Sequence, residues 1–193
     1  MLRFLAVVAG GVFIAACGLT SRSGTDEAEF AEATTFLREE IVQRMDCLQY
    51  QSGDELVRNL TRLTYIGEPA IPFLLEGLDA ESARTRGASA FVLGNLRDRR
   101  TIPALRAKLT DSVDSVRYEA ATALCAIGEN KGYPILIGGL SDPDIRNRFK
   151  AHEALKLLTS LDFGYHHDDD PAVRRTAVLR WEEWWNRLEE RPL

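Results

Sequence analysis

The sequence has little cysteine, no excess of positive charge and no apolar run long enough to cross a bilayer. Three cysteines in 193 residues are too few for a disulfide scaffold. The net charge is −5, from 24 Lys and Arg against 29 Asp and Glu. An acidic chain lacks the basic footprint that binds phosphate backbones, so we expect no nucleic acid partner. The longest apolar run spans residues 4–16, whereas a membrane-spanning helix needs about 20 residues.

Familiar catalytic motifs are missing too. The chain contains no nucleophile elbow, phosphate-binding loop, HExxH motif or Rossmann glycine pattern. Paired carboxylates such as Glu39-Glu40 fall on outward faces of expected helices, where they serve solvation. We therefore expect no enzymatic activity and no cofactor apart from a covalent lipid.

The N-terminus carries the signature of an export signal. One positive charge precedes the apolar run of residues 4–16, and the run ends in Ile14-Ala15-Ala16-Cys17-Gly18. This ending resembles the bacterial lipobox, which implies a signal peptide over residues 1–16, lipidation of Cys17 and a polar tether over residues 17–26. We expect an exported lipoprotein, held by its lipid at the periplasmic face or outer membrane. An ordinary secretory signal and an uncleaved anchor are the alternatives.

A period of 31 residues runs through the middle of the chain. Residues 71–158 keep one register, without insertion, in eight columns. The columns include Pro72, Pro103 and Pro134; Leu74, Leu105 and Leu136; and Leu93, Leu124 and Leu155. Chance does not easily align so many columns across three units, so we predict a repeat region over residues 67–159.

Each unit is typical of two helices. The first helix is short and opens at its proline, which has no N–H to lose there. Acidic residues in the following turn can cap the second helix, and Val116, Ala120, Leu124 and Ile127 form one apolar stripe on it. A single helix pair cannot bury such a stripe, so neighbouring pairs must stack. The sequence therefore predicts an all-α fold, an α-solenoid.

The flanking segments look like caps. The pattern of apolar residues over 27–66 predicts a degenerate first repeat or N-terminal cap, with helices at 30–50 and 54–66. Residues 160–170 interrupt the register as a loop, and residues 171–191 predict a C-terminal capping helix. Its apolar side carries Trp181 and Trp185, and its other side is charged, as the last element of a solenoid requires.

The repeat resembles the HEAT repeat, and more closely the short bacterial variety related to phycobilisome lyases. The likeness covers roughly residues 54–189. The shared features are the sequence Ile-Pro-x-Leu, an acidic turn, the pair Val116-Arg117, an alanine-rich stretch and the ending Ile127-Gly128. It implies HEAT-like helix pairs, but its members include scaffolds, adaptors and chromophore lyases, so it leaves the function open.

An arginine column offers a partner-binding surface. Arg86, Arg117 and Arg148 share the 31-residue spacing, and a ladder of guanidinium groups can grip carboxylates of a partner. We favour the alternative that they pair with acidic turn residues of the chain itself. The candidates for contact with an unknown protein partner are Arg86, Arg117, Glu119, Arg148 and Lys150.

A second cluster combines His166, His167 and Asp168 in the loop with His152 on the preceding helix. Imidazole and carboxylate groups are ligands for divalent metals. We favour the interpretation that this polar loop only caps the helix that opens at Pro171.

These observations favour a lipid-anchored scaffold for protein–protein interaction at the bacterial cell envelope. The alternative is a lyase-like enzyme, or its accessory subunit, that handles a tetrapyrrole-type ligand. A solvent-exposed Cys47 or Cys125 with a lowered pKa would favour that alternative.

Overall fold

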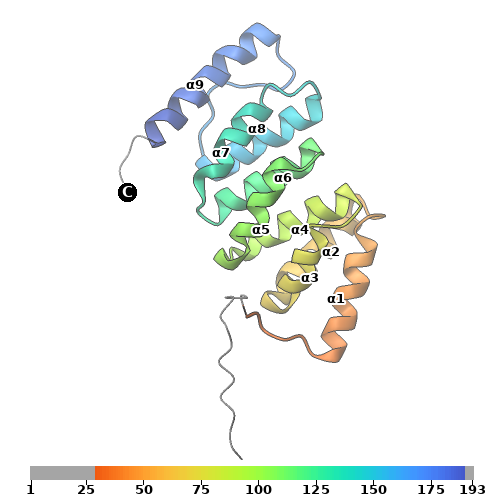
Figure 1. The fold of residues 1–193 in the computed structure, drawn as a ribbon. Helices are drawn as coiled ribbons and strands as arrows, with labels where there is room; N and C mark the ends of the chain where they lie inside the picture. The colour runs from red at the N-terminus through yellow and green to blue at the C-terminus, as the bar shows by residue number, and fades with distance from the viewer. Residues whose placement is uncertain (1–28, 190–193) are drawn as a thin grey trace, which may run out of the picture.

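The computed structural model describes residues 29–189, and over this range the chain forms α-helices and no strand. The predicted signal peptide and Cys17 lie outside the described residues. The helices are α1 (Thr35–Cys47), α2 (Gly53–Ile66), α3 (Ile71–Gly77), α4 (Ala83–Leu96), α5 (Ile102–Ala107), α6 (Asp114–Ala126), α7 (Tyr133–Gly139), α8 (Ile145–Thr159) and α9 (Pro171–Glu189). They pile up as pairs in chain order (Figure 1), which confirms the predicted solenoid.

The 31-residue period is visible in the backbone. A 3-10 turn precedes the first helix of three pairs, at Glu68–Ala70, Arg99–Thr101 and Asn130–Gly132. These turns begin at residues 68, 99 and 130, and α3, α5 and α7 follow directly with proline in their first turn. Proline fits there because its fixed φ suits a helix and its missing N–H is not needed.

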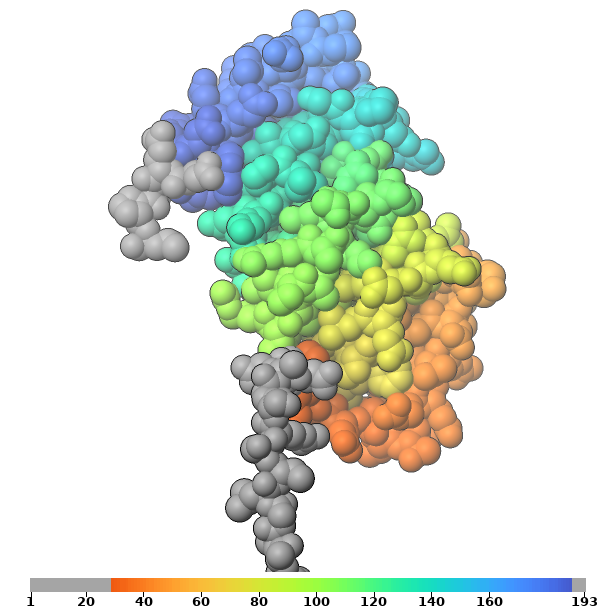
Figure 2. Space-filling view, in the orientation of Figure 1, coloured from red at the N-terminus to blue at the C-terminus, as the bar shows by residue number. Residues whose placement is uncertain are grey.

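The leucine columns form the core. Leu74, Leu105 and Leu136 of the first helices are completely buried, as are Leu93, Leu124 and Leu155 of the second helices. The core has two clusters of buried residues, and Leu109 packs against both. Each repeat therefore contributes to a core shared with its neighbours, and the space-filling surface passes through the repeats as successive bands (Figure 2).

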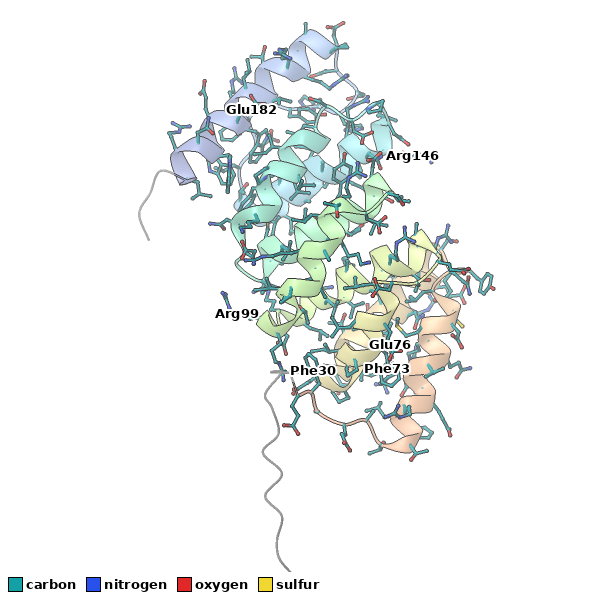
Figure 3. The ribbon with its side chains drawn as sticks, viewed as in Figure 1. Phe30, Phe73, Glu76, Arg99, Arg146 and Glu182 are labelled. Atoms are coloured by element: carbon teal, nitrogen blue, oxygen red, sulfur yellow. The ribbon has the colours of Figure 1, made fainter. Side chains whose placement is uncertain are left out.

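The N-terminal helix is shorter than the predicted 30–50. Helix α1 begins at Thr35 because the Thr34 side chain caps it, accepting a hydrogen bond from the backbone N–H of Leu37 at 3.3 Å. Phe30 lies outside the helix, where the guanidinium of Arg100 sits 4.4 Å from its ring centroid. It thus lies beside the later repeats rather than on α1 (Figure 3).

Helix α9 closes the other end of the stack. Trp181 is fully buried and meets Phe163 edge-to-face, and Trp184 meets Tyr133 in the same way. Its opposite side is exposed and carries Arg175, Glu182 and Glu183. Among residues 29–189, no helix combines the length and apolarity that a bilayer crossing requires.

Candidate ligand-binding groove

The arginine column supports the turns of the solenoid. Nη1 of Arg86 donates to the carbonyl of Ala80, six residues earlier, at 3.0 Å. Nη1 of Arg117 donates to the Asp111 carbonyl at 2.8 Å, and Nη1 of Arg148 to the Asp142 carbonyl at 2.9 Å, again over six residues. The repeated arginine thus ties the start of each second helix to the turn before it.

Two of these arginines also bond beyond their own repeat, Arg86 to the next repeat and Arg148 to the loop that follows the last one. Arg86 forms a two-pronged ion pair with Asp111 of the next turn, at 2.8 and 2.9 Å, and both side chains are nearly buried. This pairing holds the pKa of the Asp111 carboxyl below its ordinary value. Nε of Arg148 donates to the His167 carbonyl at 2.9 Å. The nearby Arg146 is 85% exposed and extends away from the stack (Figure 3), so it does not share this supporting role.

A surface hollow crosses the second helices of four consecutive repeats. It has a volume of about 540 Å³, and its lining includes Leu56 of α2, Gly87 of α4, Ser115 of α6 and Lys150 of α8. Contact of one hollow with all four helices shows that this face curves inward. Two further hollows, of about 370 and 510 Å³, adjoin it through Phe91, which lines all three. We call the three together the second-helix groove.

Large apolar side chains are exposed along this groove. Phe91 is 43% exposed, Val57 is 60% exposed, and both Tyr65 and Leu157 are 81% exposed. Single exposed apolar residues are common on protein surfaces, but a run of them lining adjoining hollows marks a binding surface.

The polar side chains of the groove are turned toward their own helices. The hydroxyls of Thr61, Thr64 and Thr122 donate to the carbonyls four residues earlier at 2.7–2.9 Å. Their methyl groups remain for an occupant, so these positions add to the apolar lining.

Charge in the groove is positive on balance, although the whole chain is acidic. Lys150 forms an ion pair with Glu119 at 2.9 Å. Arg84 and Arg97 also line the groove, and within the described residues neither has a carboxylate at ion-pair distance. Of the predicted partner contacts, the structure brings Glu119 and Lys150 together here and places Arg86, Arg117 and Arg148 at the turns.

The metal candidates do not converge. His166 and Asp168 are exposed, and the His167 ring packs on Phe149 at 5.1 Å. Asp170 caps α9 by accepting from the Ala172 N–H at 2.9 Å. Over residues 29–189, no group of three or more His, Cys, Asp or Glu side chains could hold a metal ion.

The buried cysteine in the described part of the chain is not an activated thiol. Cys47 and Cys125 are both free, and Cys125 is buried. Burial raises the pKa of the Cys125 thiol to about 12, so it remains protonated at neutral pH.

The fold is shared with known helical-repeat proteins. Residues 71–156 match the family model of HEAT repeats. A chain of the CpcE–CpcF complex of phycocyanin lyase from Nostoc sp. PCC7120 superposes with a TM-score of 0.53 at 21% identity, covering 75% of this chain and 99% of that one. These two findings support the predicted HEAT-like helix pairs.

Curated relatives carry an enzyme's name. Deoxyhypusine hydroxylase of Gallus gallus is 35% identical over 117 residues, which is 59% of this chain and 38% of the relative. The enzyme of the same name from Neurospora crassa is 47% identical over 66 residues, which is 33% of this chain and 20% of the relative. The chain thus spans less than half the length of these relatives.

These names correct two predictions. We expected no enzymatic activity and no cofactor, and both expectations are wrong in the light of relatives named as hydroxylases. Oxygen chemistry generally requires a metal or an organic cofactor. The groove itself does not fit a metal ion, because it holds one carboxylate, Glu119, against three cations.

The sequence-based candidates include Glu119 and Lys150, which line the groove, but none of its exposed apolar residues. Phe91, Val57, Tyr65 and Leu157 were not candidates, because an apolar residue inside an apolar helix looks like core. One signal could have found Phe91. Its column carries Thr122 and Glu153 at the 31-residue spacing, and polar residues in a column indicate an exposed position.

Proposed function

We propose that this chain is the substrate-holding part of an enzyme that modifies a protein, and that the second-helix groove holds the substrate. The observation that carries the proposal is the set of adjoining hollows across α2, α4, α6 and α8 with exposed Phe91 at their junction. Removing exposed apolar surface from water is favourable by about 25 cal/mol per Å². The apolar groove is therefore a better candidate for binding than the charged turns that hold the arginine column.

The relatives support the enzymatic side of the proposal. They are named as hydroxylases, and this chain matches less than half of their length. Among residues 29–189 no group of three or more His, Cys, Asp or Glu side chains could hold a metal ion, and the buried Cys125 thiol is protonated at neutral pH. We propose that this chain contributes binding and positioning, and that the reacting group comes from outside the described segment.

The cellular location belongs to the same proposal. We propose that Cys17 carries a lipid and holds the enzyme at the membrane of a bacterial envelope. The support is the spacing of Ile14-Ala15-Ala16-Cys17 after an apolar run. A diacylated cysteine anchors firmly because each buried CH₂ contributes about 0.8 kcal/mol.

A second candidate is the handling of a tetrapyrrole-type ligand. One observation favours it: Arg84 and Arg97 flank an apolar groove, which suits a flat apolar molecule with carboxylates at its edge. The similar chain from the CpcE–CpcF complex belongs to a phycocyanin lyase. A visible absorbance band that co-purifies with the chain and is lost in Phe91→Ala would support this candidate.

The proposed function is tested by comparing peptide masses across the proteome of the native host. Four strains are compared: wild type, a deletion of this chain, Phe91→Ala and Phe36→Ala. Phe36 is the matched control because it is 77% exposed on α1, outside the groove. We expect at least one protein to lose a covalent modification in the deletion and Phe91→Ala strains and to keep it in Phe36→Ala. Unchanged modification in all four strains would refute the proposal.

A further inference from the structure

We infer that the occupant of the second-helix groove is an amphipathic α-helix of a partner protein, with an apolar face and a carboxylate near each end. This inference deepens the proposed function. It rests on that proposal in one respect, because both take the second-helix groove as the binding surface.

The groove offers little to an extended peptide. Backbone N–H and C=O groups of α2, α4, α6 and α8 are already paired within their helices, and Thr61, Thr64 and Thr122 donate their hydroxyls to their own backbone. An extended segment would bring unpaired backbone groups against Phe91 and Leu60, which is unfavourable. A helix pairs its backbone internally and presents only side chains, which is how helices occupy apolar grooves.

The floor of the groove admits a helix lying along α4. Gly87, Ala88 and Gly94 line it with minimal side chains, and Phe91 projects between them. The exposed walls are apolar on both sides, with Val57 on α2 and Leu157 on α8. Apolar side chains at i, i+3, i+4 and i+7 of an occupant can enter the hollows in succession.

Cations near the two ends of α4 specify the charge of the occupant. Arg84 stands in the first turn of α4, and Arg97 follows its last residue, so the two cations flank a helix of 14 residues. At 1.5 Å per residue that separation is about 20 Å along the axis. Nη1 of Arg84, a lining residue of the groove, donates to the Gln51 carbonyl at 2.8 Å, which restrains the guanidinium. An occupant of similar length with Glu or Asp in its first and last turns matches both cations.

The backbone at Arg97 allows the charge to be removed without loss of fold. Arg97 adopts a left-handed conformation with φ of 54°, which glycine adopts more readily than arginine. Arg97→Gly therefore deletes the cation at a position where the fold itself favours glycine.

The test measures binding of synthetic peptides to the purified full chain by fluorescence anisotropy. Three labelled peptides of the length of α4 share one composition apart from their ends. The first has an apolar helical face with Glu at both ends, the second has Lys at both ends, and the third keeps the Glu ends with its apolar residues scrambled. Proteins are wild type, Phe91→Ala, Arg97→Gly and the control Phe36→Ala, each checked for melting temperature.

We expect the Glu-ended helix to bind about tenfold more tightly than the Lys-ended one at low ionic strength, with the difference shrinking in high salt. Phe91→Ala weakens binding of the Glu-ended peptide about tenfold, and Arg97→Gly reduces the preference for the Glu-ended over the Lys-ended peptide. Phe36→Ala changes neither the affinity nor the preference. Circular dichroism of the bound peptide shows added helix.

Equal binding of the Glu-ended and Lys-ended peptides would overturn the inference, as would tight binding of the scrambled peptide. Loss of binding in Phe36→Ala equal to that in Phe91→Ala would also overturn it. If no peptide binds, while a dicarboxylate bilin binds and is lost in Phe91→Ala, the occupant is a small molecule. In that case the inference fails, whereas the strain comparison above decides the proposed function independently.

Discussion

Gly94 lies where α4 packs closely against α6 of the next repeat, and it provides a sharp test of the stacking. A Cβ placed on Gly94 of α4 would lie 2.7 Å from Cα and 2.8 Å from Cβ of Ala123 on α6. Real carbon atoms do not approach so closely, and the nearest atom belongs to the backbone, which cannot rotate aside. We therefore predict that Gly94→Ala forces α4 and α6 apart.

The magnitude follows from two opposing effects. Overpacking a core position costs about 1–3 kcal/mol, and contact with backbone places this site near the upper value. Alanine is better than glycine within a helix by about 1 kcal/mol. The net loss in unfolding free energy is therefore about 2 kcal/mol. For a domain of this size, each 1 kcal/mol shifts Tm by roughly 2–4 °C, so we expect Tm to fall by roughly 4–8 °C.

Gly138 of α7 supplies the matched control. A Cβ there would meet no atom within 4 Å, and the residue is exposed. Gly138→Ala should gain helix propensity without a clash and raise Tm by roughly 1–4 °C. Thermal unfolding of both variants, followed by circular dichroism, makes the comparison. A Tm for Gly94→Ala that equals or exceeds the wild-type value would refute the close packing of neighbouring repeats.

Three further predictions concern single positions. Arg97 has a left-handed backbone conformation that glycine adopts more readily, so Arg97→Gly should raise the unfolding free energy by up to about 1 kcal/mol. Chemical denaturation measures the change, and a decrease in the unfolding free energy would contradict backbone strain at Arg97. Burial lowers the pKa of His152 in the folded state despite Asp162 at 3.9 Å. The unfolded chain therefore binds the proton more readily than the folded chain, so the stabilising effect is complete above about pH 7 and is lost as pH drops below about 6.5. The variant His152→Gln should flatten that part of the profile of unfolding free energy against pH. An unchanged slope in the variant would contradict this role of His152. Labelled palmitate should enter the wild-type chain and be absent from Cys17→Ser, and equal labelling of both would exclude lipidation at Cys17.

The repeat period predicted the fold because it reports directly on packing. The leucines of two columns, such as Leu74 and Leu93, are completely buried, since a residue that recurs in every unit occupies the same place in each interface. The start of α1 was not predicted, because apolar Phe30 fits the helical pattern but packs under Arg100 from a distant repeat. Contacts between residues so far apart in sequence leave no trace in local periodicity.

The groove was harder to predict than the fold for a related reason. In α4, Ala90, Val92 and Leu93 are buried while Phe91 among them is exposed, so a continuous apolar run conceals which side faces solvent. The arginine column shows the converse. Its spacing was plain in the sequence, but only the structure shows that the guanidinium groups turn to the carbonyls of their own turns.

The most direct test of the substrate-holding role is site-specific photocrosslinking in living cells. A photoreactive benzophenone residue replaces Phe91 in one strain and Phe36 in another, and covalently joined proteins are identified by mass spectrometry. We predict that position 91 joins a protein whose covalent modification disappears when this chain is deleted, and that position 36 does not. Capture of the same proteins from both positions, or of none that loses a modification in the deletion strain, would contradict the role of the second-helix groove.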